Sequence, residues 1–220
     1  MTTRSATLQL LSVNVGLPTV IGMRGDDPVI SGIAKQPVAA GPKRLGPAGL
    51  EGDRQADLIN HGGCDKAVYA YPAEHLPTWS AELSMICGPA TFGENLTIEG
   101  ATEKDVCIGD IWTWGDAILE IAQPRFPCYK LALHTDRPDL PKRLVASGRT
   151  GWYLRVLRPG IVDPHEEIQI LTRHDAGVTV LQAHLAGLRG QVDPSDVERI
   201  RELAPLAEAW KRRVRSVGLA

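Results

Sequence analysis

The chain has 220 residues, a formal net charge of −2 at pH 7, and 43% hydrophobic against 23% charged residues. This composition is typical of a soluble globular protein with one large domain, or one domain and an appendage. No apolar run is as long as a membrane span, and the charge gives no support to binding of a nucleic-acid polymer. Because the start lacks the pattern of a signal peptide and the four cysteines are widely spaced, we expect reduced thiols in a cytoplasmic protein.

Residues 1–173 predict a β-rich body with many turns, since proline and glycine are frequent. The strand candidates are 7–15, 29–35, 37–39, 67–71, 110–114, 117–122, 152–157 and 167–171. Gly, Pro and Asp favour loops over 16–28 and 41–49. Helices are predicted over 72–85, 128–134 and 137–147.

The pattern changes after residue 173 and predicts a three-helix module over 174–220. Thr179 and Gln182 match a capping box, and Asp193 followed by Pro194 matches the start of a second helix. A third helix is expected from about Pro205. Its basic residues Lys211, Arg212, Arg213 and Arg215 favour a solvated helix face over contact with an acidic partner or nucleic acid.

A thiol and two cations occur close together in the segment 123–130. If Pro127 takes the first helical position, Cys128 lies in the first turn, where free N–H groups favour an anion. Arg125 and Lys130 add positive charge, which should lower the pKa of the thiol and favour a thiolate that binds soft metals or attacks electrophiles. The alternative is a buried cysteine in a strand-to-helix turn.

Two further polar clusters could contact a ligand. The glycines of 61–66 let backbone N–H groups face an anion beside Lys66, and the loop 93–95 can present an amide to a heterocycle. A zinc site built from His61, Cys64, His75 and Cys128 would have spacings that match no common zinc pattern. A Cys128 nucleophile paired with His134 or His61 has no supporting local signature.

Six motifs occur in order at 49–53 (GLEGD), 61–68 (HGGCDKAV), 71–75 (YPAEH), 92–96 (FGENL), 109–110 (GD) and 124–130 (PRFPCYK). Together they make the chain similar to MOSC proteins, the domain named for the C-terminus of molybdenum cofactor sulfurase, and within them to the YiiM-type bacterial subgroup. The three-helix tail resembles the module that follows the MOSC domain there. One departure is Cys64, where the subgroup pattern has proline.

The resemblance implies an α+β fold, with a β-barrel-like MOSC domain followed by the helical module. It also implies a bound molybdenum cofactor (molybdopterin with molybdenum) whose metal takes the thiolate of Cys128 as a ligand. The residues expected to bind the cofactor phosphate are Arg125, Lys35, Ser31, Gly62 and Gly63, and Lys66 is also expected to bind the cofactor. Asn95 and His61 are candidates for the pterin ring.

Proteins of this subgroup resemble reductases that convert N-hydroxylated compounds, such as hydroxylamino-purines and amidoximes, to amines. The sequence contains no flavin, haem or iron–sulfur motif, so the electrons are expected from a separate reductase, and the activity is independent of pyridoxal phosphate. The alternatives are a sulfur carrier that holds a persulfide on Cys128, and a cofactor carrier without catalysis. A homodimer is left open.

Overall fold

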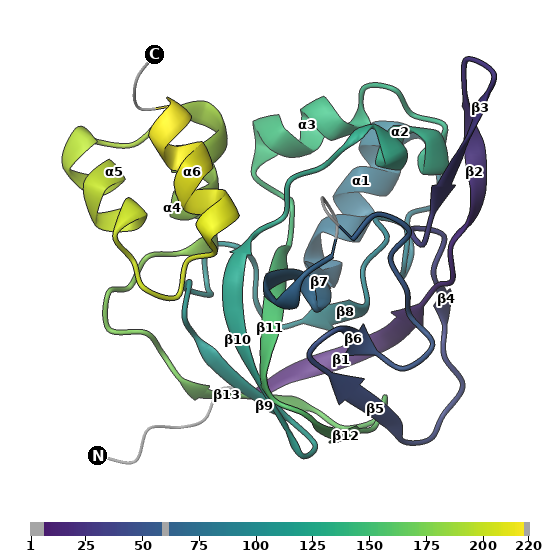
Figure 1. Cartoon of the computed structure of the whole chain (residues 1–220), viewed down its shortest axis with the longest axis horizontal. Coiled ribbons are helices and arrows are strands. Elements are labelled where there is room, and N and C mark those ends of the chain that lie inside the picture. Colours follow the sequence, from purple (N-terminus) through teal and green to yellow (C-terminus); the bar gives the residue numbers. More distant parts are fainter. Residues whose placement is uncertain (1–6, 59–61, 218–220) are drawn as a thin grey trace.

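Seven strands close into a β-barrel in the computed structural model, which describes residues 7–58 and 62–217 (Figure 1). Around the barrel their order is β13-β9-β10-β11-β7-β8-β1, and β1 pairs with β13 to close the ring. Only the β7–β8 pair is parallel among these neighbours. The bounds are β1 (Thr7–Val15), β7 (Val68–Pro72), β8 (Leu96–Glu99), β9 (Ile111–Trp114), β10 (Ala117–Pro124), β11 (Trp152–Arg158) and β13 (Ile168–Thr172).

The barrel interior is filled by large apolar side chains from alternating strand positions, as expected for a small barrel. Trp112 and Trp152 are fully buried and meet edge to face, with ring centroids 5.9 Å apart. Six of the strands predicted from hydrophobic alternation are present, whereas the strand predicted at 29–35 ends at Ser31 and the one at 37–39 overlaps only Gln36–Pro37. The α+β class with a β-barrel is confirmed.

Two segments predicted as loops contain short strands. Residues 16–28 hold β2 (Thr19–Arg24) and the start of β3 (Asp27–Ser31), which form a projecting hairpin (Figure 1). Gly25 adopts a left-handed φ of 62° in the turn, so glycine marks a hairpin turn here and not the end of regular structure. The remaining short strands are β4 (Gln36–Pro37), β5 (Lys43–Gly46), β6 (Gly49–Leu50) and β12 (Gly160–Val162).

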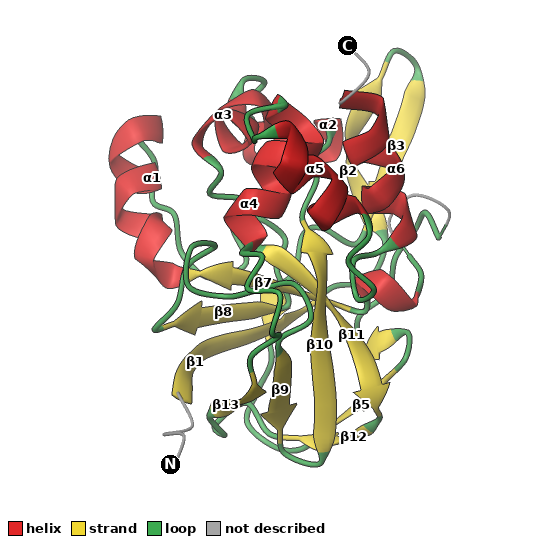
Figure 2. Ribbon diagram, turned by 90° about the vertical axis from the view of Figure 1, so that its left-hand side faces the viewer, coloured by secondary structure: helices red, strands yellow, loops and turns green. Residues whose placement is uncertain are grey.

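The helices gather at one end of the barrel (Figure 2). Short 3₁₀ turns, η1 (Cys64–Lys66) and η2 (Ala73–His75), precede β7 and α1 respectively. The other bounds here are α1 (Leu76–Leu83), α2 (Tyr129–Thr135) and α3 (Leu140–Ser147). The predicted start of α2 is wrong, because Cys128 is extended, with φ −123° and ψ 173°, and is the residue that caps the helix. Pro127 therefore precedes the cap and does not occupy the first helical position.

The tail contains α4 (Val180–His184), a π-helical turn η3 (Leu185–Arg189), α5 (Pro194–Arg201) and α6 (Glu208–Val217). The capping box of Thr179 and Gln182 is confirmed, as is the Asp193 cap. The tail packs into the same apolar cluster as the barrel, and the Ala207 N–H donates to the Ala122 carbonyl of β10 at 3.0 Å. A division into domains 1–173 and 174–220 stays a prediction. Within the described residues, no helix has the length and apolar character needed to cross a membrane.

Candidate functional site

One cavity at the helical end of the barrel brings together six of the residues predicted for the site. They are Ser31, Lys35, Lys66, Asn95, Arg125 and Cys128, and we call the space that they line the site cavity. It is also lined by Tyr69 and Tyr153 of neighbouring strands. Residues from distant parts of the sequence therefore converge at the end of the barrel where β7 and β11 begin and β10 ends.

Arg125 lies immediately after β10 and is almost completely buried, with 5% of its surface exposed. Its guanidinium lies over the ring of Tyr69, with the central carbon 4.9 Å from the ring centroid. Burial opposes its charge, but Tyr69, Tyr153 and Cys128 outweigh this effect and raise the pKa of Arg125. Its Nη1 has no hydrogen-bond partner among the described residues. A buried charged donor without an acceptor is costly, so this nitrogen is suited to an anion bound in the cavity.

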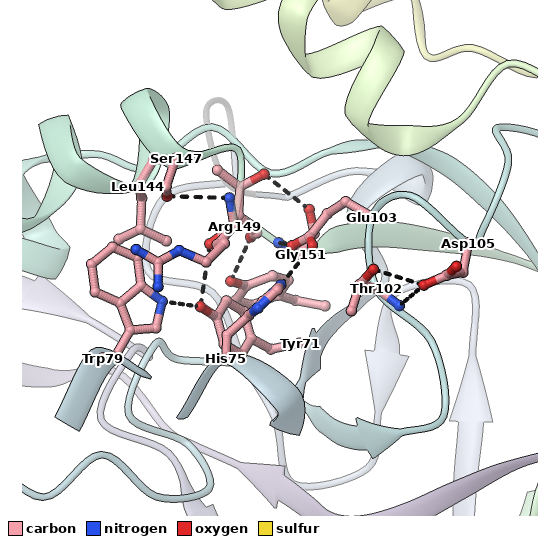
Figure 3. Close-up of polar contacts among 12 residues, drawn as sticks. Tyr71, His75, Trp79, Thr102, Glu103, Asp105, Leu144, Ser147, Arg149 and Gly151 are labelled. Carbon is pink, nitrogen blue, oxygen red and sulfur yellow. Dashed lines mark hydrogen bonds and ion pairs between the residues drawn. The ribbon is translucent and has the colours of Figure 1, made fainter. Parts of the chain in front are cut away.

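The backbone of Arg125 is fixed by the loop 148–151. Its N–H donates to the Gly151 carbonyl at 3.1 Å, and the Gly151 N–H donates to Glu103 Oε1 at 2.7 Å. Gly151 has a φ of 66°, and a Cβ there would lie 2.4 Å from the Ala70 carbonyl oxygen, so only glycine fits. Glu103 also contacts His75, with 2.7 Å between Oε2 and Nε2 (Figure 3). This carboxylate thus positions the chain segment that carries Arg125.

Aromatic residues complete the support of the same loop (Figure 3). The Tyr71 hydroxyl donates to the Arg149 carbonyl at 3.2 Å and accepts from Trp79 Nε1 at 2.6 Å. The Arg149 guanidinium lies over the Trp79 ring at 3.8 Å. Tyr69 donates to the Thr150 carbonyl at 2.9 Å, so the residue under Arg125 is itself anchored to the loop.

A second buried network beside the cavity centres on Asp53, for which the sequence motifs predict no role. Its carboxylate pairs with the Lys35 ammonium and accepts from Asn95 Nδ2 at 2.9 Å. Burial lowers the pKa of Lys35, whereas Asp53 raises it. Asn95 Nδ2 also donates to the Asn14 carbonyl at 3.2 Å, and Asn95 Oδ1 accepts from the Tyr69 N–H at 3.0 Å. The amide hydrogens of Asn95 therefore brace the protein, and its predicted contact with a pterin ring stays a prediction.

The glycine turn lies beside the site cavity but Gly62 and Gly63 are not among the residues that line it. The Gly63 carbonyl accepts from the Lys66 N–H at 3.0 Å and so places Lys66, which does line the cavity. Ser31 Oγ accepts from the Ile33 N–H at 3.3 Å. His61 lies outside the described residues, and its predicted role stays untested.

The four cysteines occupy different environments. Cys128 is half-buried and lines the site cavity, whereas Cys64 is exposed with its Sγ 3.9 Å from Asp65 Oδ1. Cys87 and Cys107 are buried, and burial raises the pKa of both thiols. Cys128 is therefore the thiol placed to meet a ligand in this cavity.

Of the two alternative sites, the zinc site is not assembled in the part of the chain that the structure describes, and a Cys128 nucleophile paired with His61 or His134 stays a prediction, since His61 lies outside that part. No group of three or more His, Cys, Asp and Glu residues there could hold a metal ion, and His75 is engaged with Glu103. His134 is not part of the cavity lining, and burial, with a smaller effect of Arg125, lowers its pKa.

Beyond Cys128 the space continues into a second hollow against α6, which we call the tail chamber. Its lining includes Lys66, Gln123, Phe126, Lys130, Arg212 and Arg213. Six residues line both spaces: Asp57, Lys66, Phe126, Cys128, Lys130 and Tyr153. The helical tail thus forms one side of the site, a contribution that the tail sequence alone did not reveal.

Comparison with known proteins identifies the family of the chain. The MOSC domain pattern matches residues 57–169, and the chain belongs to the MOSC domain family. It is 41% identical over 202 residues to the uncharacterized protein YflK of Bacillus subtilis, covering 92% of this chain and 90% of that protein. It is 38% identical over 168 residues to Protein YiiM of Escherichia coli, covering 74% of each.

A solved structure and a longer fungal protein complete the comparison. The crystal structure of YiiM from Geobacillus stearothermophilus superposes with a TM-score of 0.80 at 31% identity, covering 96% of this chain and 98% of that chain. A protein named "Reductase" from Gibberella moniliformis is 37% identical over 137 residues, which cover 60% of this chain and 24% of that protein. The chain is therefore a MOSC protein of the YiiM type.

Proposed function

We propose that this chain is an oxidoreductase that binds a molybdenum cofactor and reduces N-hydroxylated compounds to amines. The coarser part of this proposal, an oxidoreductase of the MOSC family, is supported by the similarity to YiiM and to a fungal reductase. The finer part rests on the chemistry of the site cavity.

The observation that carries the proposal is the unpartnered Nη1 of Arg125, buried in the same cavity as the Cys128 thiol. A guanidinium suits a phosphate because its planar fork can donate two parallel hydrogen bonds. A thiolate is the protein ligand that suits a soft metal. The cavity thus offers a cation for the phosphate of a pterin cofactor and a sulfur ligand for its metal, and the residues present fit that group.

When bound, the cofactor would supply two-electron redox chemistry at molybdenum. Cys128 would hold the metal, Arg125 would bind the phosphate, and Lys35, fixed by Asp53, would line the cavity as a further hydrogen-bond donor. Tyr153 also lines the cavity, and burial raises the pKa of its hydroxyl, which therefore keeps its proton at neutral pH and can donate to a bound substrate.

The reaction breaks the N–O bond of the substrate. An N-hydroxylated amine, two electrons and two protons give the amine and one water. We assign the supply of electrons to a separate reductase, and the substrate to the open side of the site next to Cys128.

The test compares protein from a host that makes the cofactor with the same chain from a host that cannot. Each sample receives 6-hydroxylaminopurine and a chemical electron source, and adenine formation is followed. We expect turnover only in the cofactor-competent preparation. Equal turnover in both preparations, or none in the competent one, would refute the proposal.

A further inference from the structure

The tail chamber carries an excess of positive charge on its walls. Four cations line it, Lys66, Lys130, Arg212 and Arg213, against one carboxylate, Asp57. Arg212 and Arg213 line this space alone, whereas the other three charged residues also line the site cavity. They come from three separate parts of the fold: the turn before β7, helix α2, and the tail helix α6. Like charges brought together by folding repel one another, and a bound anion relieves this repulsion.

One of these cations, Arg213, is held against aromatic rings, whereas Arg212 is exposed. The Arg213 guanidinium lies 3.9 Å from the Phe126 ring centroid and 5.9 Å from that of Trp210. Burial lowers the pKa of both Lys66 and Arg213. Asp57 and Asp65 raise the pKa of Lys66, and the neighbouring charge of Arg213 lowers it further. An anionic ligand would therefore stabilise the charged form of both side chains.

The chamber also offers groups that suit a nucleobase. Gln123 is 3% exposed and donates through Nε2 to the Pro124 carbonyl at 3.2 Å, whereas its Oε1 has no partner among the described residues. This oxygen can accept a hydrogen bond from a ligand N–H. Phe126 and Tyr129 line the same space with partly exposed rings. An arginine lies over each ring, Arg213 over Phe126 and Arg24 over Tyr129, so a heterocycle would stack on the ring surface that stays exposed.

We propose that the tail chamber binds the phosphate of a nucleotide, so that the preferred substrate is an N-hydroxylated nucleobase carried on a nucleoside monophosphate rather than the free base. The inference rests on the proposed function, because it places the reacting base towards Cys128. Arg125 serves a different anion: it is buried in the site cavity, whereas Arg212 is exposed on α6 and suits a ligand that exchanges with solvent.

The test uses the cofactor-loaded protein with 6-hydroxylaminopurine riboside and its 5′-monophosphate. We expect the monophosphate to have a KM at least about tenfold lower, the difference that one or two charge-assisted hydrogen bonds provide. Arg212→Ala should bring the ratio of the two KM values towards one. Lys211→Ala is the matched control, because Lys211 lies on the same helix, pairs with Glu208 at 3.0 Å and does not line the chamber. Titration calorimetry with AMP and adenosine should show the same preference in binding.

Three results would overturn the inference. Equal KM values for the two substrates would exclude a phosphate site, and loss of molybdenum from Arg212→Ala would assign this cation to the cofactor. A higher KM for the electron-donating reductase, with the substrate ratio unchanged, would make the basic wall a docking surface for that protein. If the wild-type chain reduces neither substrate but binds AMP more tightly than adenosine through Arg212, the reductase proposal fails while the phosphate site stands.

Discussion

The two walls of the site are built differently. On the barrel wall, Lys35, Asn95 and Arg125 are each less than a tenth exposed and are fixed through Asp53 or the Gly151 carbonyl. On the tail wall, Arg212 is exposed and Arg213 is half-buried against aromatic rings. Rigid, desolvated cations suit a group that stays bound, whereas solvent-accessible cations suit a ligand that enters and leaves. The contrast supports a resident cofactor on one side and an exchanging substrate on the other.

The tail wall depends on packing that is shared with the barrel. Trp210 of α6 is 1% exposed, and its Nε1 donates to the Ala183 carbonyl at 2.9 Å. Its apolar cluster continues into barrel residues such as Leu119 and Trp152. Removing the tail would therefore expose the barrel core as well as open the chamber.

The largest effect is expected from truncation after Arg173. Loss of the buried Trp210 side chain alone would cost about 3–5 kcal/mol, against a typical total stability of roughly 5–15 kcal/mol. The truncated chain should be largely insoluble, or unfold at a clearly lower temperature in a thermal melt. A control that ends at Val217 retains α6. A truncated protein as stable and active as the full chain would show that the tail wall is dispensable.

The second largest effect is expected from replacing Cys128, the thiol that lines the site cavity. Cys128→Ser should reduce turnover of the N-hydroxylated purine to background, since a serine hydroxyl is a poor ligand for a soft metal. Cys64→Ser is the matched control and should stay within about twofold of wild type, because Cys64 is exposed and does not line the site cavity. Full activity of Cys128→Ser, or loss only in Cys64→Ser, would reverse the assignment.

A smaller, graded effect is expected at Arg125. Arg125→Ala removes the charge and should weaken cofactor retention by about 10- to 100-fold. Arg125→Lys keeps the charge but loses the two parallel donors of the guanidinium, so its retention should lie between those of the wild type and Arg125→Ala. Molybdenum content after dialysis measures retention. Arg158→Ala provides the control, since Arg158 is exposed and bonds to the Asp116 carbonyl away from the cavity. Unchanged metal content in both Arg125 variants would remove this residue from the site.

Much of this architecture could be predicted from local patterns. The hairpin of β9 and β10 follows from alternating residues around Gly115 and Asp116, and the tail helices from the Thr179 and Asp193 caps. Cys128 and Arg125 stood out because a thiol and a cation occur close together beside prolines. These signals lie within a few residues of one another, which is why sequence inspection detects them.

The features that were missed depend on contacts between distant residues. The β2–β3 hairpin is built around glycine and proline, which sequence patterns associate with loops. The role of Asp53 appears only when Lys35 and Asn95 are brought to it by folding. The approach of α6 to Cys128 likewise requires the tail to dock beside the barrel, and no periodicity encodes that placement.

Molybdenum content tests the central claim most directly, since the barrel wall is interpreted as a site for a molybdenum cofactor. The wild-type chain and Cys128→Ser are produced in a cofactor-competent host, and metal is measured per chain by mass spectrometry. One thiolate ligand per chain predicts about one molybdenum in the wild type and markedly less in the variant. A metal-free wild-type chain that carries labile sulfur on Cys128 would contradict the account and favour a persulfide carrier.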